Sequence, residues 1–174
     1  CVCSGSGSAV RRAPCAARAL SAVGGAPRVW IALAVGSRCA GAPATAGRLE
    51  ADRVWMVDPL DGTKEFIRRN GEFTVNIGLA DHGRPVLGVV YCPSSGVCYF
   101  AMQGQGAWRQ SGSAGPEPIR VSVYDPAQPR IVASRSHAGE AVTAFRQALA
   151  AKSGSDPAIV SMGSALKVCV VAEG

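Results

Sequence analysis

The sequence of 174 residues lacks any hydrophobic run long enough to cross a membrane as a helix. The longest purely apolar run near its N-terminus is Val29–Val35, far short of the ~20 residues that such a helix needs. Charged residues are sparse at 17%, whereas hydrophobic residues reach 48%, so a packed core is feasible and wholesale disorder is not expected. We therefore expect one folded domain with no transmembrane segment.

Histidine is scarce, and the cysteines show no regular spacing. The two histidines, His82 and His137, have no neighbouring motif, and the seven cysteines follow no repeated spacing. No further ligand pair completes a zinc set beside Cys92 and Cys98, and no Ser or Cys nucleophile has partners at triad spacing. An odd number of scattered cysteines does not resemble a secreted disulfide framework, so we expect buried thiols and a cytoplasmic location.

Acidic residues are missing from the first part of the chain. Residues 1–49 contain six arginines and no Asp, Glu or Lys, so they carry the whole net charge of +6. Residues 50–174 hold the other 12 basic residues and all 12 acidic ones, and their formal charge is zero. A basic groove is therefore not indicated for the main part, and we predict no nucleic-acid partner.

The same segment shows no sustained helical or strand period. Three interpretations are open: a disordered or targeting extension, a poorly patterned part of the fold, or an incomplete or misread stretch that is not the natural N-terminus. Because the segment is rich in arginine, a fourth interpretation is an arm that binds RNA or a membrane surface. We favour the misread stretch, which divides the chain into an atypical segment 1–49 and a domain of residues 50–174.

From Val54 onward the patterns predict regular elements. An apolar run is expected to form a buried strand that Pro59 ends, and alternating residues around Leu79 indicate a three-stranded antiparallel meander. The expected strands are 54–57, 72–80, 86–91, 97–102, 119–123, 131–133 and 158–160, with a loop over 104–118. Helices are expected at 138–151, with Phe145 on its buried face, and at 164–173, with Ser164 as N-cap and Cys169 buried. Such an order suggests a layered α/β sandwich.

Two carboxylates three residues apart mark the most informative stretch. Asp58 and Asp61 lie just beyond the expected strand end, with Pro59 fixing one backbone dihedral between them. A corner of this kind can direct both carboxylates and the Leu60 carbonyl to one point, and Mg²⁺ prefers such oxygen ligands. The alternative is an ordinary solvated Asp-Gly turn.

The two residues that follow suit a phosphate group. Gly62 lets the backbone turn closely, and the N–H groups of Gly62 and Thr63 would open the next helix, where unpaired donors favour anions. A metal beside a phosphate, with the Thr63 hydroxyl next to both, is the arrangement of metal-assisted phosphate hydrolysis.

The stretch Asp58–Thr63 resembles the D-P-[LI]-D-G-T motif of the inositol monophosphatase superfamily. The longer string Trp55–Asn76 is similar to one branch, the bacterial CysQ-type 3′(2′),5′-bisphosphate nucleotidases. Further motifs agree in family order over roughly residues 53–174: Gly88–Tyr91, Gly106–Trp108, Ser134–His137, Gly163–Lys167 and Val171–Gly174. The resemblance implies an α/β fold, the layered αβαβα sandwich of the sugar phosphatases, here incomplete.

The resemblance also implies site roles and a reaction. Asp58, Asp61 and the Leu60 carbonyl would bind two or more Mg²⁺ ions, and Leu60, Asp61, Gly62 and Thr63 would contact the substrate. Asp58, Asp61 and Thr63 would be catalytic, the Thr63 hydroxyl orienting the attacking water. The implied reaction is hydrolysis of adenosine 3′,5′-bisphosphate to AMP and phosphate, by a homodimer that is cytoplasmic or peripheral at the inner membrane.

Two family segments have no counterpart here. The upstream S-E-E acids are missing, and the chain ends before the W-D motif that carries the last metal aspartate. We therefore expect a fragment with weaker Mg²⁺ binding and doubtful turnover. Arg135 and His137 are candidate contacts for a nucleotide phosphate. The alternatives are an inositol or fructose bisphosphate phosphatase of the same superfamily, or a non-catalytic nucleotide- or metal-binding remnant.

Overall fold

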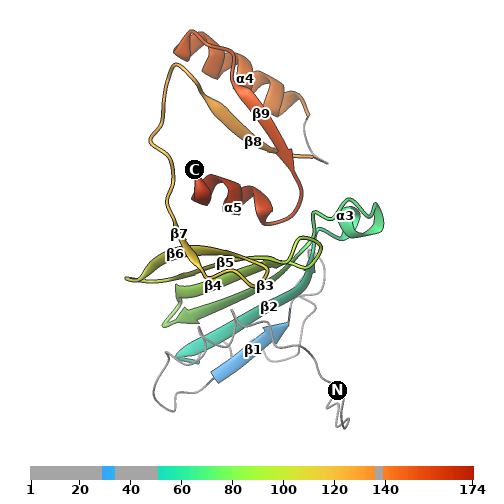
Figure 1. Ribbon diagram of the computed structural model, residues 1–174, viewed down its shortest axis with the longest axis vertical. Coiled ribbons are helices and arrows are strands. Elements are labelled where there is room, and N and C mark those ends of the chain that lie inside the picture. Colours follow the sequence, from blue (N-terminus) through green and yellow to red (C-terminus); the bar gives the residue numbers. More distant parts are fainter. Residues whose placement is uncertain (1–28, 34–50, 136–138) are drawn as a thin grey trace.

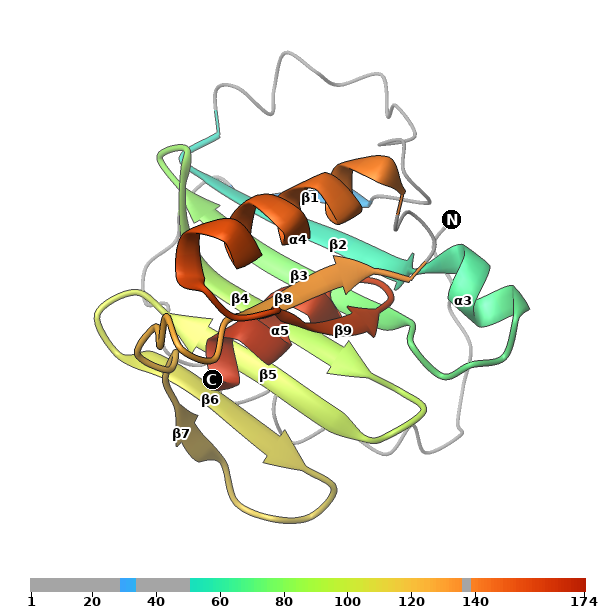
Figure 2. The ribbon, with the colours of Figure 1, turned by 90° about the horizontal axis from the view of Figure 1, so that it is seen from above.

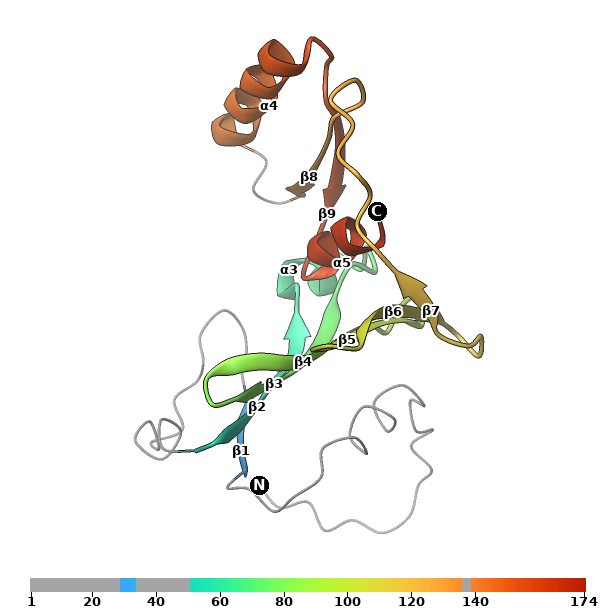
Figure 3. The same ribbon diagram turned by 90° about the vertical axis from the view of Figure 1, so that its left-hand side faces the viewer.

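A computed structural model describes residues 29–33, 51–135 and 139–174, the first range by its backbone alone. The described residues form a seven-stranded sheet, ordered β1-β2-β3-β4-β5-β6-β7, and a separate two-stranded sheet of β8 and β9. Helix α5 lies between the two sheets, and α4 lies beyond the small sheet (Figure 1 and Figure 3). This layering confirms the predicted α/β sandwich. The predictions made for residues 1–28, 34–50 and 136–138, including the candidate His137, concern residues outside those that the structure describes.

The elements follow one another in a simple chain order. The large sheet contains β1 (Val29–Leu33), β2 (Arg53–Asp61), β3 (Thr74–Asp81), β4 (Arg84–Cys92), β5 (Val97–Met102), β6 (Gly106–Ser111) and β7 (Glu117–Ile119). The small sheet contains β8 (Arg130–Ser134) and β9 (Ala158–Met162), which pair in parallel. The helices are α3 (Thr63–Ile67), α4 (Glu140–Ser153) and α5 (Leu166–Glu173).

The predicted meander of β3, β4 and β5 is confirmed and carries the core. Residues His82 and Gly83 form its first turn with φ of 48° and 76°, the left-handed backbone that tight hairpins need. Period-two alternation places apolar side chains on one face of the sheet. The buried cluster consists of Leu79, Leu87, Val89 and Cys98, with Trp55, Ile77, Val86, Tyr91, Phe100 and Met102 packed against it.

Three strand predictions were wrong. Strand β2 continues through Pro59 to Asp61 because a β-bulge accommodates the proline. Strand β6 lies inside the predicted loop 104–118, where Trp108 stacks on Phe100 of β5 at 5.5 Å between ring centroids. The predicted strand 119–123 is absent from the described structure, because β7 already ends at Ile119. Val123 is 94% exposed, since no described strand pairs with it.

The helices agree with the sequence in position but only partly in burial. In α5, Cys169 is buried as predicted, but the N-cap is Ala165 rather than Ser164. In α4, the predicted buried face is wrong, since Phe145 is 59% exposed. Helix α4 lies on the outer side of the small sheet, at one end of the described structure (Figure 1 and Figure 2), and none of its residues is buried. Among the described residues, no helix is long and apolar enough to span a membrane.

Candidate functional site

A β-bulge in β2 brings the two predicted aspartates to one face of the sheet. Side chains three residues apart on a regular strand point to opposite faces. Here Asp58 pairs with Asn76 and Asp61 pairs with Thr74, so β2 uses one more residue than β3 between these pairs. The extra residue returns both carboxylates to the same side, a common function of bulges beside active sites.

Asp61 is held by groups from two other elements. Its Oδ2 atom accepts hydrogen bonds from the Ala165 N–H at 2.7 Å, the Asn76 side-chain amide at 3.4 Å and the Thr74 hydroxyl at 3.5 Å. Thr74 is fully buried. The contact with Ala165 joins residues 104 apart in the sequence and brings the start of α5 to the corner of the large sheet.

Oxygen atoms from the same corner suit a hard divalent cation. Asp58 Oδ1 accepts a hydrogen bond from the Leu60 N–H at 3.1 Å, and this carboxylate lies beside Asp61 on the shared face. The Oδ1 atom of Asn76 is buried and has no hydrogen-bond partner in the described part of the chain. Carboxylate and amide oxygens of this kind fit Mg²⁺. However, no group of three or more His, Cys, Asp or Glu side chains gathers as a metal cluster among the described residues.

Gly62 makes the turn from β2 into α3. Its φ of 87° lies in the left-handed region that favours glycine. A Cβ at this position would lie 3.0 Å from the Ser164 Cβ and 3.1 Å from the Glu72 carbonyl oxygen, which is too close. Helix α3 then begins at Thr63, as the sequence predicted, with Thr63 exposed. The backbone N–H groups at this turn are therefore presented beside the two aspartates.

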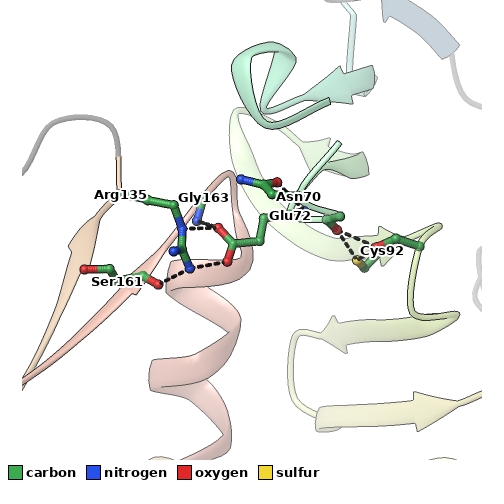
Figure 4. A network of polar contacts seen from close by, with 8 residues as sticks. Asn70, Glu72, Cys92, Arg135, Ser161 and Gly163 are labelled. Carbon is green, nitrogen blue, oxygen red and sulfur yellow. Dashed lines mark hydrogen bonds and ion pairs between the residues drawn. The ribbon is translucent and has the colours of Figure 1, made fainter. Parts of the chain in front are cut away.

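Two further carboxylates lie behind the corner. Glu65 is only 6% exposed, and a Cβ at Gly163 would overlap its Cγ atom. Glu72 accepts hydrogen bonds from Arg135 Nε at 3.0 Å, Arg135 Nη2 at 2.5 Å and the Gly163 N–H at 2.7 Å (Figure 4). The hydrogen bond to Glu72 and its charge raise the pKa of the Arg135 guanidinium. Contact of Arg135 with a nucleotide phosphate stays a prediction.

A cavity of about 480 Å³ opens between the large sheet and α5. Its lining is mainly apolar and includes Asp58, Asn76 and Ala165. The cavity therefore places open space directly beside the aspartate corner.

The sequence located the corner but not all of its partners. Asp58, Leu60 and Asp61 lie at the end of β2, Gly62 makes the turn and Thr63 begins α3, while the roles of these residues stay predictions. The structure adds neighbours to which sequence reasoning gave no role: Thr74, Asn76, Glu72 and Ala165. Their only signal was their place inside the quoted motifs, because contacts over such separations leave no local pattern.

Comparison with known proteins supports the same assignment. A family model described as "Inositol monophosphatase family" matches residues 34–174. The chain belongs to the inositol monophosphatase family. The match begins inside segment 1–49, and the division of the chain at residue 50 stays a prediction.

Curated members of the family are similar over most of this chain. The 3′(2′),5′-bisphosphate nucleotidase CysQ of Escherichia coli (strain K12) is 49% identical over 122 residues, which make up 70% of this chain and 46% of that protein. The protein of the same name from Salmonella typhimurium is 47% identical over 132 residues, or 76% of this chain and 50% of that protein. This chain thus spans about half the length of the curated relatives it matches.

Solved structures agree with the fold. The crystal structure of CysQ from Bacteroides thetaiotaomicron, a bacterial member of the inositol monophosphatase family, matches with a TM-score of 0.68 and 38% identity. That match covers 83% of this chain and 56% of the solved one. Inositol monophosphatase II from Staphylococcus aureus MSSA476 matches with a TM-score of 0.62 and 26% identity, over 84% of this chain and 52% of that one.

Proposed function

We propose that this chain is part of a Mg²⁺-dependent phosphomonoesterase that hydrolyses the 3′-phosphate of adenosine 3′,5′-bisphosphate, giving AMP and phosphate. The observation that carries the proposal is the bulge that places Asp58 and Asp61 on one face, with the Ala165 N–H on Asp61. The nucleotide is favoured over other phosphate esters by the 49% identity with a protein named as a 3′(2′),5′-bisphosphate nucleotidase.

Each residue of the corner has a distinct role in this proposal. Asp58, Asp61 and the Leu60 carbonyl would hold Mg²⁺, which when bound neutralises negative charge on the phosphoryl oxygens. The N–H groups of Gly62 and Thr63 lie at the start of α3, where backbone donors have no acceptor within the helix. They would bind phosphate oxygens. The exposed Thr63 hydroxyl would accept or donate a hydrogen bond to the attacking water and so fix its direction.

Phosphate release tests the reaction and its substrate together. We expect release from adenosine 3′,5′-bisphosphate to require Mg²⁺ and to exceed release from inositol 1-phosphate at equal concentrations. Preference for inositol 1-phosphate would instead favour an inositol phosphatase of the same family. Equal release with and without Mg²⁺ would contradict the metal-dependent reaction.

Replacement of Thr63 tests the role of its hydroxyl. In a preparation that shows turnover, Thr63→Ala should lower kcat by roughly 10-fold or more and leave KM nearly unchanged, because the hydroxyl acts on the water rather than on the bound nucleotide. Thr63→Ser, which keeps the hydroxyl, is the matched control and should retain most of the rate. A rise in KM with an intact kcat would contradict this role.

A non-catalytic binding protein is the second candidate, and one observation favours it. Within the described residues the corner offers two carboxylates and no larger acidic cluster. This candidate predicts that the nucleotide binds, as measured by calorimetry, but that no phosphate is released at any Mg²⁺ concentration. The homodimer, the cytoplasmic location and peripheral association with the inner membrane remain predictions, which sedimentation and cell fractionation can test.

A further inference from the structure

Glu72 has no role in the reaction proposed above, yet its carboxylate joins three segments of the fold. It lies on the loop between α3 and β3, and its side chain is 18% exposed. Arg135, just after β8, donates two hydrogen bonds to it, and Gly163, just after β9, donates its backbone N–H (Figure 4). The same guanidinium also donates to the Ser161 carbonyl at 3.0 Å, which fixes it against the end of β9.

The loop that carries Glu72 is itself anchored. The Glu72 N–H donates to the Asn70 side-chain oxygen at 3.0 Å. The Gly71 carbonyl accepts hydrogen bonds from the Ser94 hydroxyl and, at 3.4 Å, from the Cys92 thiol, both at the β4–β5 turn. Gly71 has a φ of 80°, and a Cβ there would lie 3.2 Å from the Ser94 Oγ. The position of Glu72 is therefore set by the large sheet.

The segment that Glu72 contacts leads directly to the aspartate corner. Gly163 binds Glu72, and two residues later the Ala165 N–H donates to Asp61 Oδ2 at 2.7 Å. Ser164 between them has a φ of 49°, which is unfavourable for a residue with a side chain. Such a backbone persists only where its surroundings hold it on both sides. One carboxylate lies on each side here, Glu72 before Ser164 and Asp61 after it.

We propose that Glu72, clamped by Arg135, is a positioning residue that fixes the Gly163 N–H and so places the Ala165 N–H on Asp61. The proposal deepens the function proposed above and rests on it only for the role of Asp61. An ion pair that merely joined the two sheets would need Glu72 and Arg135 but not the hydrogen bond to Gly163. The two explanations therefore predict different outcomes when the charges are exchanged.

Amide hydrogen exchange, measured residue by residue by NMR, separates them. Glu72→Gln leaves one neutral acceptor for three donors, so the Gly163 and Ala165 amides should exchange roughly 10-fold faster, as expected for the loss of a charge-assisted hydrogen bond. The Leu79 amide, in the buried meander, should exchange at the wild-type rate. Asp156→Asn is the matched control, because Asp156 forms a similar two-bond ion pair with Arg146 of α4.

The charge exchange Glu72→Arg with Arg135→Glu gives the deciding result. It can restore an ion pair, but an arginine at position 72 cannot accept the Gly163 N–H. We expect the Ala165 amide to stay fast in this double variant. Recovery of the wild-type rate there, or a wild-type rate in Glu72→Gln, overturns the proposal.

A second variant and the phosphate-release assay ensure that the experiment can be interpreted. If Glu72→Gln does not fold, Arg135→Gln serves instead, because Arg135 is 47% exposed and its loss should still speed exchange at Ala165 at least threefold. An unchanged Ala165 rate in that variant would count against the clamp. Because amide exchange needs no substrate, absent phosphate release in the wild type would contradict the proposed reaction and leave the positioning result standing.

Discussion

At the scale of single residues, the corner depends on which atoms of Asp58 and Asp61 remain available. Within the part of the chain that the structure describes, Asp61 Oδ2 accepts hydrogen bonds from three donors, whereas Asp58 Oδ1 accepts one, from the nearby Leu60 N–H. With respect to these described residues, each carboxylate retains a second oxygen for a cation. Asn76 pairs with Asp58 across β2 and β3, and its buried Oδ1, which has no partner among the described residues, adds a further oxygen.

Removing either charge should therefore weaken cation binding. Asp58→Asn and Asp61→Asn should each lower Mg²⁺ affinity by roughly 10-fold, because a neutral amide is a poorer ligand for a hard cation. Isothermal titration with MgCl₂ measures this directly. Asp156→Asn, which removes a carboxylate remote from the corner, should leave the titration unchanged. Wild-type affinity in both corner variants would remove the metal-site assignment.

Cys169 gives the fold a pH dependence of known sign. Burial, and then the charge of Glu173, raise the pKa of its thiol to about 11 from an ordinary value of about 9. The unfolded chain therefore loses this proton at lower pH than the folded chain does. Stability from the neutral thiol is complete below about pH 9 and is lost as the pH rises toward about 11.

Urea unfolding at a series of alkaline pH values tests this expectation. The midpoint of the wild-type chain should fall more steeply above about pH 9 than that of Cys169→Ala, which has no thiol to ionise. Parallel curves for the two chains would show that the thiol does not titrate differently in the two states.

At the scale of elements, two glycines allow the turn after β2 and the turn after β9 to touch. Gly62 and Gly163 each approach the backbone of Glu72, and their missing side chains leave room for Ser164 and Glu65. The close contact brings α5 and the small sheet to the corner of the large sheet. Close packing of these turns, rather than any single helix, therefore assembles the site.

A methyl group at one of these turns should be costly. Gly163→Ala places a Cβ into Glu65 and should destabilise the fold by about 1–3 kcal/mol, the usual range for overpacking. Gly88→Ala is the matched control, since nothing lies within 4 Å of its Cβ position, and it should be neutral or stabilising by about 0.5 kcal/mol. Urea denaturation compares the two, and equal stabilities would show that the turns do not pack closely.

At the scale of the whole molecule, α5 and β9 expose much of their apolar surface. Val168 and Val171 of α5 are 73% and 54% exposed, and Ile159 of β9 is 40% exposed. Other large hydrophobic side chains are exposed on β2 and α3, namely Met56, Phe66 and Ile67.

Surface of this kind favours self-association. We expect sedimentation velocity of this chain to show assemblies whose fraction grows with protein concentration. Val168→Thr with Val171→Thr should reduce that fraction, because it removes apolar area from α5 without changing its helical ends. Lys152→Gln, a change on the exposed end of α4, is the control. An equal degree of association in all three chains would exclude the α5 surface as its cause.

The local features of the fold could be predicted from the amino-acid pattern. Alternating apolar residues fixed the meander of β3, β4 and β5, and the D-P-L-D-G-T string identified the corner and the start of α3. These features depend on residues close together in the chain, so their patterns can be read directly. The family assignment followed from such strings.

The completion of the corner depends on contacts between segments that are far apart in the sequence. The bulge at Pro59 depends on the register with β3, and the partners of Asp61 and Glu72 come from segments that meet only after the two sheets pack. Likewise, Phe145 lies on a face that looks apolar in the sequence, but among the described residues no layer covers it and its side chain is exposed. Contacts between distant segments arise from packing, and the local pattern of a chain carries no record of them.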